Sequence, residues 1–307
     1  MALGVAGFRV GCWTDPTGRT GCTVVLAPRG ALGAAAVRGG APGTREVSVL
    51  GHTSRVEECH GVALSGGSAF GLATADGAVR WCEAHGIGDD KTGARVPIVA
   101  AAIVFDRRDV DAPRPGADAG WAACEAATEA DPPMGSVGVG AGCTVGKTAG
   151  PQWGSKGGQG WAVASAGGVT VGALMAVNAL GDVLDEAGRV LAGSRAPADR
   201  PRFPAVALGL EAGDHTMIGC LVTDARLSKA DAVRAADLAH SGVARAVTPA
   251  HTSYDGDALF LLCAQRVPAV VDLVADLGAR AVSAAVRAAV RAATGIPGFP
   301  PDPRAHP

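Results

Sequence analysis

The sequence predicts an α/β (α+β) protein in which strands and helices pack in close layers. Its 307 residues include 45 glycines, while only 4% of the residues are aromatic and 18% are charged. Such a composition is typical of a folded protein with tightly layered small side chains, and it excludes a disordered or fibrous chain. Apolar runs of strand length, bounded by turn residues, alternate with longer segments of helical periodicity. The length allows a sizeable core in one large or two ordinary domains.

The N-terminal part predicts a hairpin over residues 5–28 that ends in the strand 21–26. A helical pattern then runs from Ser68 to about His85, with Ser68 expected as its N-cap. A hydrolase nucleophile at Ser68 is disfavoured, because the Gly-x-Ser-x-Gly elbow would need a glycine where Phe70 stands.

The glycines before this helix suit a close approach to a sheet or a ligand. We therefore regard Gly66, Gly67 and Ser68 as a possible substrate pocket.

Further elements follow from the same periodicities. The predicted strands are 96–105, 161–166, 170–177, 182–185, 217–222 and 258–262, and the predicted helices are 118–130, 228–240 and 268–294.

The glycine-rich segment 135–148 fits neither nucleotide-binding motif. A phosphate-binding loop would need glycine at Ala141, and a dinucleotide-binding turn would need glycine at Val145. The segment leaves Lys147 as a cation among backbone amides, where it can polarise a hydroxyl or stabilise negative charge. The other interpretation is a solvated loop lysine, and Lys156 in the next glycine-rich turn is a weaker candidate.

Asn178 stands where the predicted strand 170–177 ends. It is either a turn former or an amide that donates to an oxyanion.

We place the chemistry in the stretch 211–224, at Thr216, directly before the predicted strand 217–222. We expect the bond between His215 and Thr216 to break itself and leave Thr216 as an amino terminus. A terminal threonine is a complete catalyst, because its hydroxyl is the nucleophile and its α-amine, with a pKa of about 8, is the base. The proline-rich segment 199–204 predicts a surface linker before this bond.

Two carboxylates, Asp255 and Asp257, flank Gly256 before the strand 258–262. A calcium loop is not indicated, because the order of residues is wrong and no later acidic ligands follow. A plain hairpin turn of the Asp-Gly kind stays open as an interpretation.

Several of these segments together resemble the family of L-aminopeptidase/D-esterase-amidases, which includes the β-peptidyl aminopeptidases and the nylon-oligomer hydrolase. The resemblance extends over nearly the whole chain. The motifs that carry it are Val10-Gly-Cys-Trp-Thr-Asp15, Thr20-Gly-Cys-Thr-Val-Val25, Ala63-Leu-Ser-Gly-Gly-Ser-Ala-Phe-Gly-Leu72, Gly138 to Lys147, Val177-Asn178-Ala-Leu-Gly-Asp182, Thr216-Met-Ile-Gly and His251-Thr-Ser-Tyr-Asp-Gly-Asp257.

The resemblance implies a four-layer αββα sandwich that forms a single hydrolase domain over 1–307 and processes itself into chains 1–215 and 216–307. It implies a small peptide or amino-acid amide as substrate, no cofactor, and a homo-oligomer that is a tetramer of processed pairs.

The resemblance also implies a role for each site residue. Thr216 is the nucleophile, Lys147 is its cationic neighbour and Asn178 is an oxyanion donor. Asp255 and Asp257 orient and charge-balance the terminal amine and the lysine.

One departure from the family concerns the residue before the nucleophile. Nylon-hydrolase-like members break the bond after asparagine, whereas His215 precedes Thr216 here. His215 either slows the cleavage or assists it as a local base.

Two alternative functions stay open. An acyl transferase resembling ornithine acetyltransferase is disfavoured, because an apolar run, 258–262, follows the Asp-Gly-Asp turn where that family has a polar stretch. An unprocessed, catalytically silent member that binds a ligand in the same pocket is disfavoured by the presence of every polar candidate.

The remaining expectations are about surroundings and partners. A formal net charge of −2 provides no electrostatic reason for binding nucleic acid or an acidic membrane. The eight cysteines show no metal-ligand spacing, so we expect no metal site and reduced thiols in a cytoplasmic protein. We also expect no export signal and no membrane span.

Overall fold

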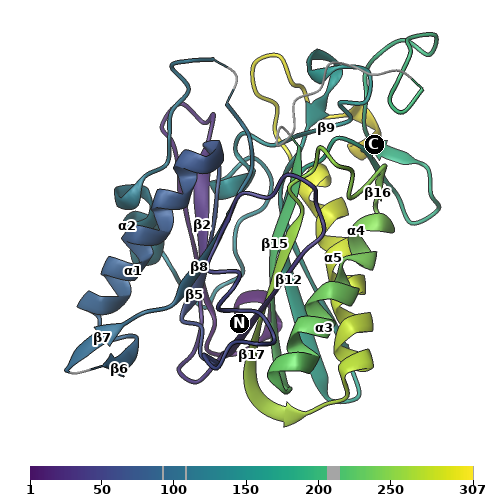
Figure 1. Cartoon of the computed structure of the whole chain (residues 1–307). Coiled ribbons are helices and arrows are strands. Elements are labelled where there is room, and N and C mark those ends of the chain that lie inside the picture. The colour runs from purple at the N-terminus through teal and green to yellow at the C-terminus, as the bar shows by residue number, and fades with distance from the viewer. Residues whose placement is uncertain (92, 108, 206–214, 307) are drawn as a thin grey trace.

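The computed structural model describes residues 1–91, 93–107, 109–205 and 215–306. Two five-stranded sheets lie face to face, and helices cover the outer face of each (Figure 1). Residues 211–214, which belong to the predicted catalytic stretch 211–224, lie outside the described residues. His215 and Thr216 lie within them.

In each sheet one pair of strands is parallel and the other pairs are antiparallel. The first sheet has the order β1 (Arg9–Thr14), β2 (Gly21–Leu26), β5 (Gly61–Ser65), β8 (Val99–Ile103), β4 (Thr44–Arg45). The second has the order β11 (Gly158–Ala166), β12 (Val169–Asn178), β15 (Thr216–Arg226), β17 (Ala258–Pro268), β3 (Leu32–Val37). The parallel pairs are β5 with β8 and β15 with β17.

Shorter strands and the helices complete the chain. The short strands are β6 (Asp89–Lys91), β7 (Ala94–Val96), β9 (Thr144–Val145), β10 (Ser155–Lys156), β13 (Asp182–Leu184), β14 (Val190–Ala192) and β16 (Val247–Thr248). The α-helices are α1 (Thr74–Ala84), α2 (Ala117–Glu125), α3 (Lys229–Ala239), α4 (Ser241–Ala244) and α5 (Val271–Arg291). Single 3-10 turns cover Ala2–Gly4, Ser68–Ala73, Gly138–Gly140, Pro151–Trp153 and Pro303–Ala305.

Three apolar layers hold the four layers of elements together. β15 illustrates the alternation, because Ile218 and Cys220 face the layer between the sheets, while Met217 and Leu221 face the layer beneath α3 and α5. A third layer lies between the first sheet and helices α1 and α2. The four-layer αββα sandwich is therefore confirmed.

Small residues make this packing close. A Cβ atom on Gly77 of α1 would lie 1.8 Å from the carbonyl oxygen of Ala117, and one on Gly120 of α2 would lie 1.9 Å from that of Thr74. Helices α1 and α2 thus touch backbone to backbone, as the glycine-rich composition predicts.

The expected helix cap at Ser68 is wrong. Gly67 and Ser68 both have left-handed backbones (φ 82° and 59°), and the chain enters a 3-10 turn with no side-chain cap hydrogen bond. The turn is held from outside instead, because the backbone N–H of Gly67 donates to Asp106.

Element boundaries differ from the predictions where other contacts intervene. The predicted strand 96–105 is divided, because Pro97 follows β7 and only Val99–Ile103 pairs in the first sheet. Helix α2 stops at Glu125, since Thr128 pairs with Val10 through two backbone hydrogen bonds. The strand predicted over 258–262 continues to Pro268, and the helix predicted from Ser68 starts at Thr74, after a 3-10 turn. The other predicted strands and helices are present within about four residues of their expected ends.

The other structural expectations concern thiols and membranes. All eight cysteines are free thiols, and all except Cys12 are buried. None of the helices in the described ranges combines the length and the apolar character needed to cross a bilayer.

Candidate active site

The strand register places two of the predicted site residues opposite each other. β12 ends at Asn178, β15 begins at Thr216, and the two residues are partners in the antiparallel ladder. Thr216 is 1% exposed. The predicted position of Thr216 at the beginning of a strand is confirmed.

The hydroxyl of Thr216 faces the bond that precedes it. Its Oγ1 donates to the carbonyl oxygen of His215 at 2.5 Å, and the backbone N–H of Gly256 donates to the same oxygen at 2.9 Å. A Cβ atom on Gly256 would lie 3.1 Å from Thr216 Oγ1, so this backbone approaches as closely as it does because it carries no side chain. The carbonyl is therefore polarised by two donors.

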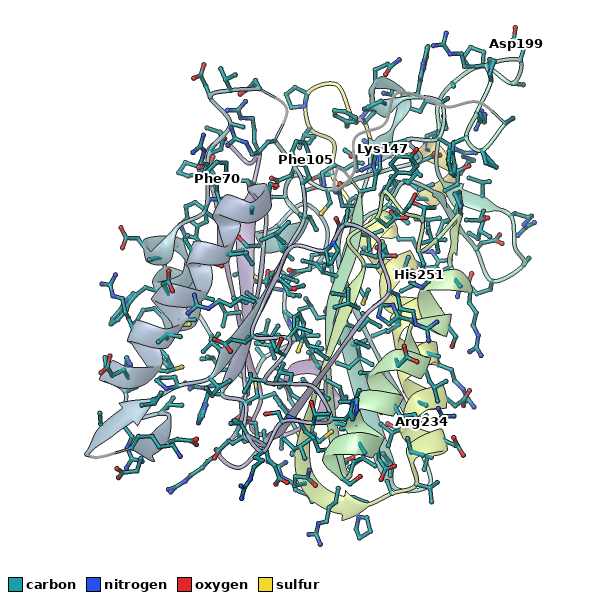
Figure 2. All side chains as sticks on the ribbon, viewed as in Figure 1. Phe70, Phe105, Lys147, Asp199, Arg234 and His251 are labelled. Atoms are coloured by element: carbon teal, nitrogen blue, oxygen red, sulfur yellow. The ribbon has the colours of Figure 1, made fainter. Side chains whose placement is uncertain are left out.

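Lys147 reaches the same place from the glycine-rich segment. It is 4% exposed, and its Nζ donates to the backbone carbonyl of Asn178 at 3.0 Å and to the side-chain Oδ1 at 3.2 Å. In Figure 2 Lys147 and Phe105 lie at the same end of the molecule, between its two halves. A solvated loop lysine is excluded by this burial.

Asn178 is held by neighbours on both sides of its amide group. Its Oδ1 also accepts from the backbone N–H of Thr144 at 3.0 Å, and its Nδ2 donates to the carbonyl of Phe105 at 3.0 Å. The amide thus positions Lys147 and ties the second sheet to the end of β8.

The two aspartates approach from the turn before β17. Asp257 Oδ1 accepts from the backbone N–H of Met217 at 2.6 Å, and its Oδ2 lies 2.6 Å from Nδ1 of His251. Asp255 forms a parallel bridge with His215 and accepts two hydrogen bonds from Thr252. Burial and the nearby charge of Asp257 raise the pKa of Asp255. A plain hairpin turn is excluded, because this segment joins the short β16 to a strand parallel to β15.

His215 is neutral in this setting. It is 1% exposed, and neither ring nitrogen has a hydrogen-bond partner among the described residues. Burial and the charge of Lys147 lower its pKa to about 2. So weak a base argues against His215 as a local base at neutral pH.

A small pocket of about 90 Å³ adjoins His215. It is lined by Phe105, Asp106, Arg107, Thr144, Lys147, Pro151, His215 and Phe299. Gly66, Gly67 and Ser68 do not line it, but the backbone N–H of Gly67 donates at 2.7 Å to Asp106, which does.

Sequence reasoning missed Asp106 and His251. Asp106 follows the buried strand β8 closely, and a carboxylate just beyond a strand end was the available signal. His251 stands within the motif that supplied the two aspartates. Lys156, the weaker candidate, is fully buried and donates to the carbonyls of Gly140, Cys143 and Gly157, which is a structural role.

A separate group, Glu58, His60 and Asp89, brings three potential metal-ligand atoms within 4.8 Å of one another. The backbone N–H of Ile98 donates to Nδ1 of His60 at 3.0 Å, so the proton of the neutral ring is on Nε2, the nitrogen facing the carboxylates. A metal ion would have to displace that proton, which makes this group a poor ligand set.

Solved structures share this architecture. A β-aminopeptidase from Burkholderia sp. superposes with a TM-score of 0.72 at 20% identity, covering 96% of this chain and 87% of that one. The L-aminopeptidase D-Ala-esterase/amidase from Ochrobactrum anthropi, described as a variant of the Ntn hydrolase fold, superposes with a TM-score of 0.70 at 19% identity, covering 97% and 88%. The fold is that of the N-terminal nucleophile hydrolases.

The sequence comparisons then define the family. The model of Peptidase family S58 matches residues 3–300, and the chain belongs to this family. An uncharacterised aminopeptidase of Mycobacterium tuberculosis is 40% identical over 291 residues, which cover 86% of this chain and 81% of the relative. A 6-aminohexanoate-oligomer endohydrolase of Agromyces sp. is 30% identical over 279 residues, covering 85% and 74%. The protein is a hydrolase of amide bonds.

Proposed function

We propose that the chain cuts itself between His215 and Thr216 and then hydrolyses small peptides or amino-acid amides with Thr216 as its terminal nucleophile. One observation carries the proposal. The Thr216 hydroxyl donates at 2.5 Å to the carbonyl of the bond to be cut, and the Gly256 N–H donates to the same oxygen.

The cleavage uses the Thr216 hydroxyl as an internal nucleophile. Oγ1 bonds to the carbonyl carbon of His215, and the developing oxyanion is stabilised by the N–H of Gly256. The C–N bond then breaks, the nitrogen takes the hydroxyl proton and becomes the α-amine of Thr216, and an ester joins the two parts. Water hydrolyses this ester, leaving chains of 215 and 307 − 215 = 92 residues.

In the mature enzyme the free α-amine accepts the hydroxyl proton while Oγ1 attacks a substrate carbonyl. The leaving amine departs with a proton, and water hydrolyses the acyl-enzyme. We assign Asp255 and Asp257 to orient and charge-balance the new ammonium group. The bridge of Asp255 to His215 and the hydrogen bond from the Met217 N–H to Asp257 support this assignment. Lys147 is the cationic neighbour, held in place by Asn178.

The group that donates to the oxyanion in the mature enzyme can differ from the group that donates during self-cleavage. In the intact chain Asn178 directs its Nδ2 to the carbonyl of Phe105, and the Gly256 N–H serves the His215 carbonyl. That Asn178 donates to the oxyanion after processing stays a prediction. Such a donor is worth roughly 3 to 4 kcal/mol in the transition state.

The test is an intact mass spectrum of the purified protein together with aminoacyl p-nitroanilide hydrolysis. We expect two chains for the wild type and for Thr216→Ser, and one full-length chain for Thr216→Ala with activity reduced by ~10³ or more. A single full-length wild-type species, or activity that survives in Thr216→Ala, would overturn the proposal. An intact, inactive wild type would instead support a catalytically silent member.

The substrate class within the amides is also proposed. The curated relatives include an aminopeptidase and a 6-aminohexanoate-oligomer hydrolase. The substrates to compare are therefore α-peptides, β-peptides, D-amino-acid amides and 6-aminohexanoate oligomers.

We further propose a cytoplasmic location and a tetramer of processed pairs. The location is supported by eight free thiols, which persist in a reducing compartment. The assembly rests on family resemblance, and light scattering of the processed protein tests it.

A further inference from the structure

We infer that the side chain of His215 marks the pocket that receives the acyl side chain of the substrate, and that this pocket selects amides of amino acids with a neutral ring. The inference rests on the proposed function, because it needs Thr216 to be the nucleophile in both reactions. It adds a substrate class to that function.

The first step is geometrical. A single hydroxyl, placed by the first residue of β15, attacks two carbonyl groups in turn, that of His215 and that of a substrate. Both reactions form an ester on Oγ1, with the acyl group of residue 215 in the first and that of the substrate in the second. Because a rigid strand holds this oxygen, we place the two acyl groups in the same pocket. The group attached to the substrate carbonyl carbon then lies where the residue 215 side chain lies.

The second step concerns the walls of that place. The His215 ring is buried, and the small pocket beside it is walled on its apolar side by Phe105, Pro151 and Phe299. The polar side is formed by Asp106, Arg107, Thr144 and Lys147, which are one carboxylate, two cations and a hydroxyl. The space that the His215 ring fills, together with about 90 Å³ of free space beside it, accommodates a ring of imidazole or phenyl size.

The third step concerns charge. The ring nitrogens of His215 have no hydrogen-bond partner in the described part of the chain. The ring is therefore held by the shape of its surroundings and not by hydrogen bonds. The charge of Lys147 disfavours a second cation, and together with burial it keeps the histidine neutral. The carboxylate of Asp106 is already held by Thr20 Oγ1 and the Gly67 N–H, both at 2.7 Å.

The substrate experiment compares kcat/KM of the processed enzyme for p-nitroanilides of phenylalanine, histidine, alanine, glutamate and lysine. We expect the two ring-bearing substrates to exceed the alanyl and the lysyl substrates by at least about tenfold, the scale on which an apolar pocket discriminates. Equal efficiencies, or a preference for the lysyl or the glutamyl substrate, would overturn the inference and leave the proposed function standing.

A pocket variant tests the assigned wall. Phe299→Ala should lower the ratio of phenylalanyl to alanyl kcat/KM by about tenfold, because the ring loses a contact surface that the methyl group never used. Val270→Ala, an exposed residue beyond the far end of β17, is the control and should leave the ratio unchanged. Circular dichroism and Phe299→Leu separate a folding defect from a loss of selectivity.

The cleavage reaction provides an independent readout of the same pocket. Residue 215 is itself the acyl residue in that step, so His215→Lys should be cleaved at least about tenfold more slowly than His215→Phe. Equal cleavage rates would contradict the inference. If the wild type neither cleaves itself nor hydrolyses any amide, the proposed function fails and the inference fails with it.

Discussion

Asp257 connects the nucleophile to a histidine that the motif analysis overlooked. One carboxylate oxygen accepts from the N–H that follows Thr216, and the other lies 2.6 Å from His251 Nδ1 (Figure 2 shows His251). His251 is held with a left-handed backbone (φ 57°) and packs edge-to-face on His240, with ring centroids 4.9 Å apart. Asp257 is therefore held between the start of β15 and His251.

His251 should make stability depend on pH. Although burial opposes it, the hydrogen bond and charge of Asp257 raise the pKa of His251, whereas burial lowers the pKa of His240 to about 4. A raised pKa means that the ion pair stabilises the fold fully below about pH 6.5 and that this contribution is lost as pH rises through the folded-state value.

The measurement compares His251→Asn with its parent in the uncleaved Thr216→Ala background, by guanidinium unfolding. Asparagine tolerates the left-handed backbone. We expect a loss of about 2 kcal/mol at pH 5.5 that becomes smaller by pH 9. A loss that is the same at both pH values would show that His251 contributes packing alone.

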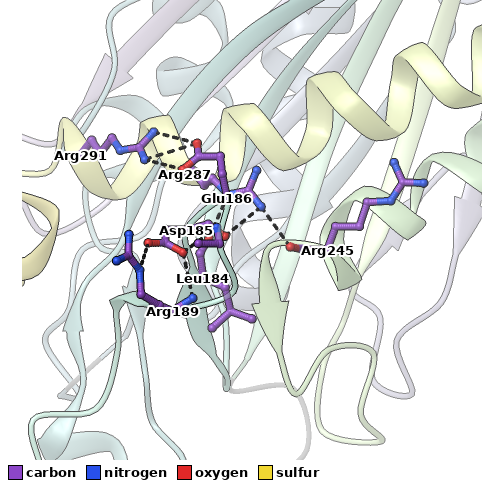
Figure 3. A network of polar contacts seen from close by, with 8 residues as sticks. Leu184, Asp185, Glu186, Arg189, Arg245, Arg287 and Arg291 are labelled. Atoms are coloured by element: carbon purple, nitrogen blue, oxygen red, sulfur yellow. Dashed lines mark hydrogen bonds and ion pairs between the residues drawn. The ribbon is translucent and has the colours of Figure 1, made fainter.

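At the scale of elements, the two chains that the proposed cleavage would produce share one sheet. β12 belongs to the 215-residue part and β15 to the other, and they pair over residues 171–178 and 216–223. A second connection lies on the helix face, where Arg287 of α5 donates to the carbonyl of Leu184 and Arg291 pairs with Glu186 (Figure 3). Arg287 also donates to the carbonyl of Arg245, within its own part of the chain. We expect the two chains to remain associated after cleavage.

Arg287 tests this connection. Arg287→Ala leaves the carbonyl of Leu184 without its donor, and should lower the free energy of unfolding by about 1 to 2 kcal/mol. Arg280→Ala removes an exposed arginine that pairs with Asp276 one turn away on the same helix, and should change it by less than about 0.5 kcal/mol. Equal effects in guanidinium titrations would argue against a specific role for Arg287.

Element boundaries show what local periodicity can predict. The strands 161–166 and 170–177 were predicted within a few residues, because their turn contains two glycines with positive φ. Helix α2 was predicted too long, because its end is set by the pairing of Thr128 with a distant strand. Contacts between distant segments leave no local signal.

At the scale of the whole molecule, composition and periodicity predicted the α/β class, and family resemblance added the four layers. The site was predicted through motifs alone. Asn178 and Thr216 become neighbours through the register of β12 on β15, and Asp257 through the parallel pairing of β17. A local sequence pattern does not predict the register between distant strands. For that reason Asp106 and His251, to which the family resemblance gave no role, were missed.

The thiols offer a test of how closely the whole molecule is packed. Burial raises the pKa of Cys59 to about 11 and those of Cys82 and Cys263 to about 12. Burial also raises the pKa of Cys12, the one cysteine that is only partly buried. At pH 8 we therefore expect a disulfide reagent such as DTNB to react slowly with the native protein, at Cys12 first, and rapidly with all eight cysteines in guanidinium. Rapid modification of several thiols in the native state would contradict this packing.

The burial of Thr216 has a consequence for timing. In the intact chain the nucleophile, His215, Lys147, Asn178 and both aspartates are each at most 4% exposed. If the proposed cleavage occurs, we expect the newly folded molecule to be latent, because the described residues bury the Thr216 hydroxyl until the bond is cut. The proposed maturation would then proceed at a rate that depends on the fold and not on the concentration of substrate. A competitive inhibitor added early would stop hydrolysis of substrate without stopping self-cleavage.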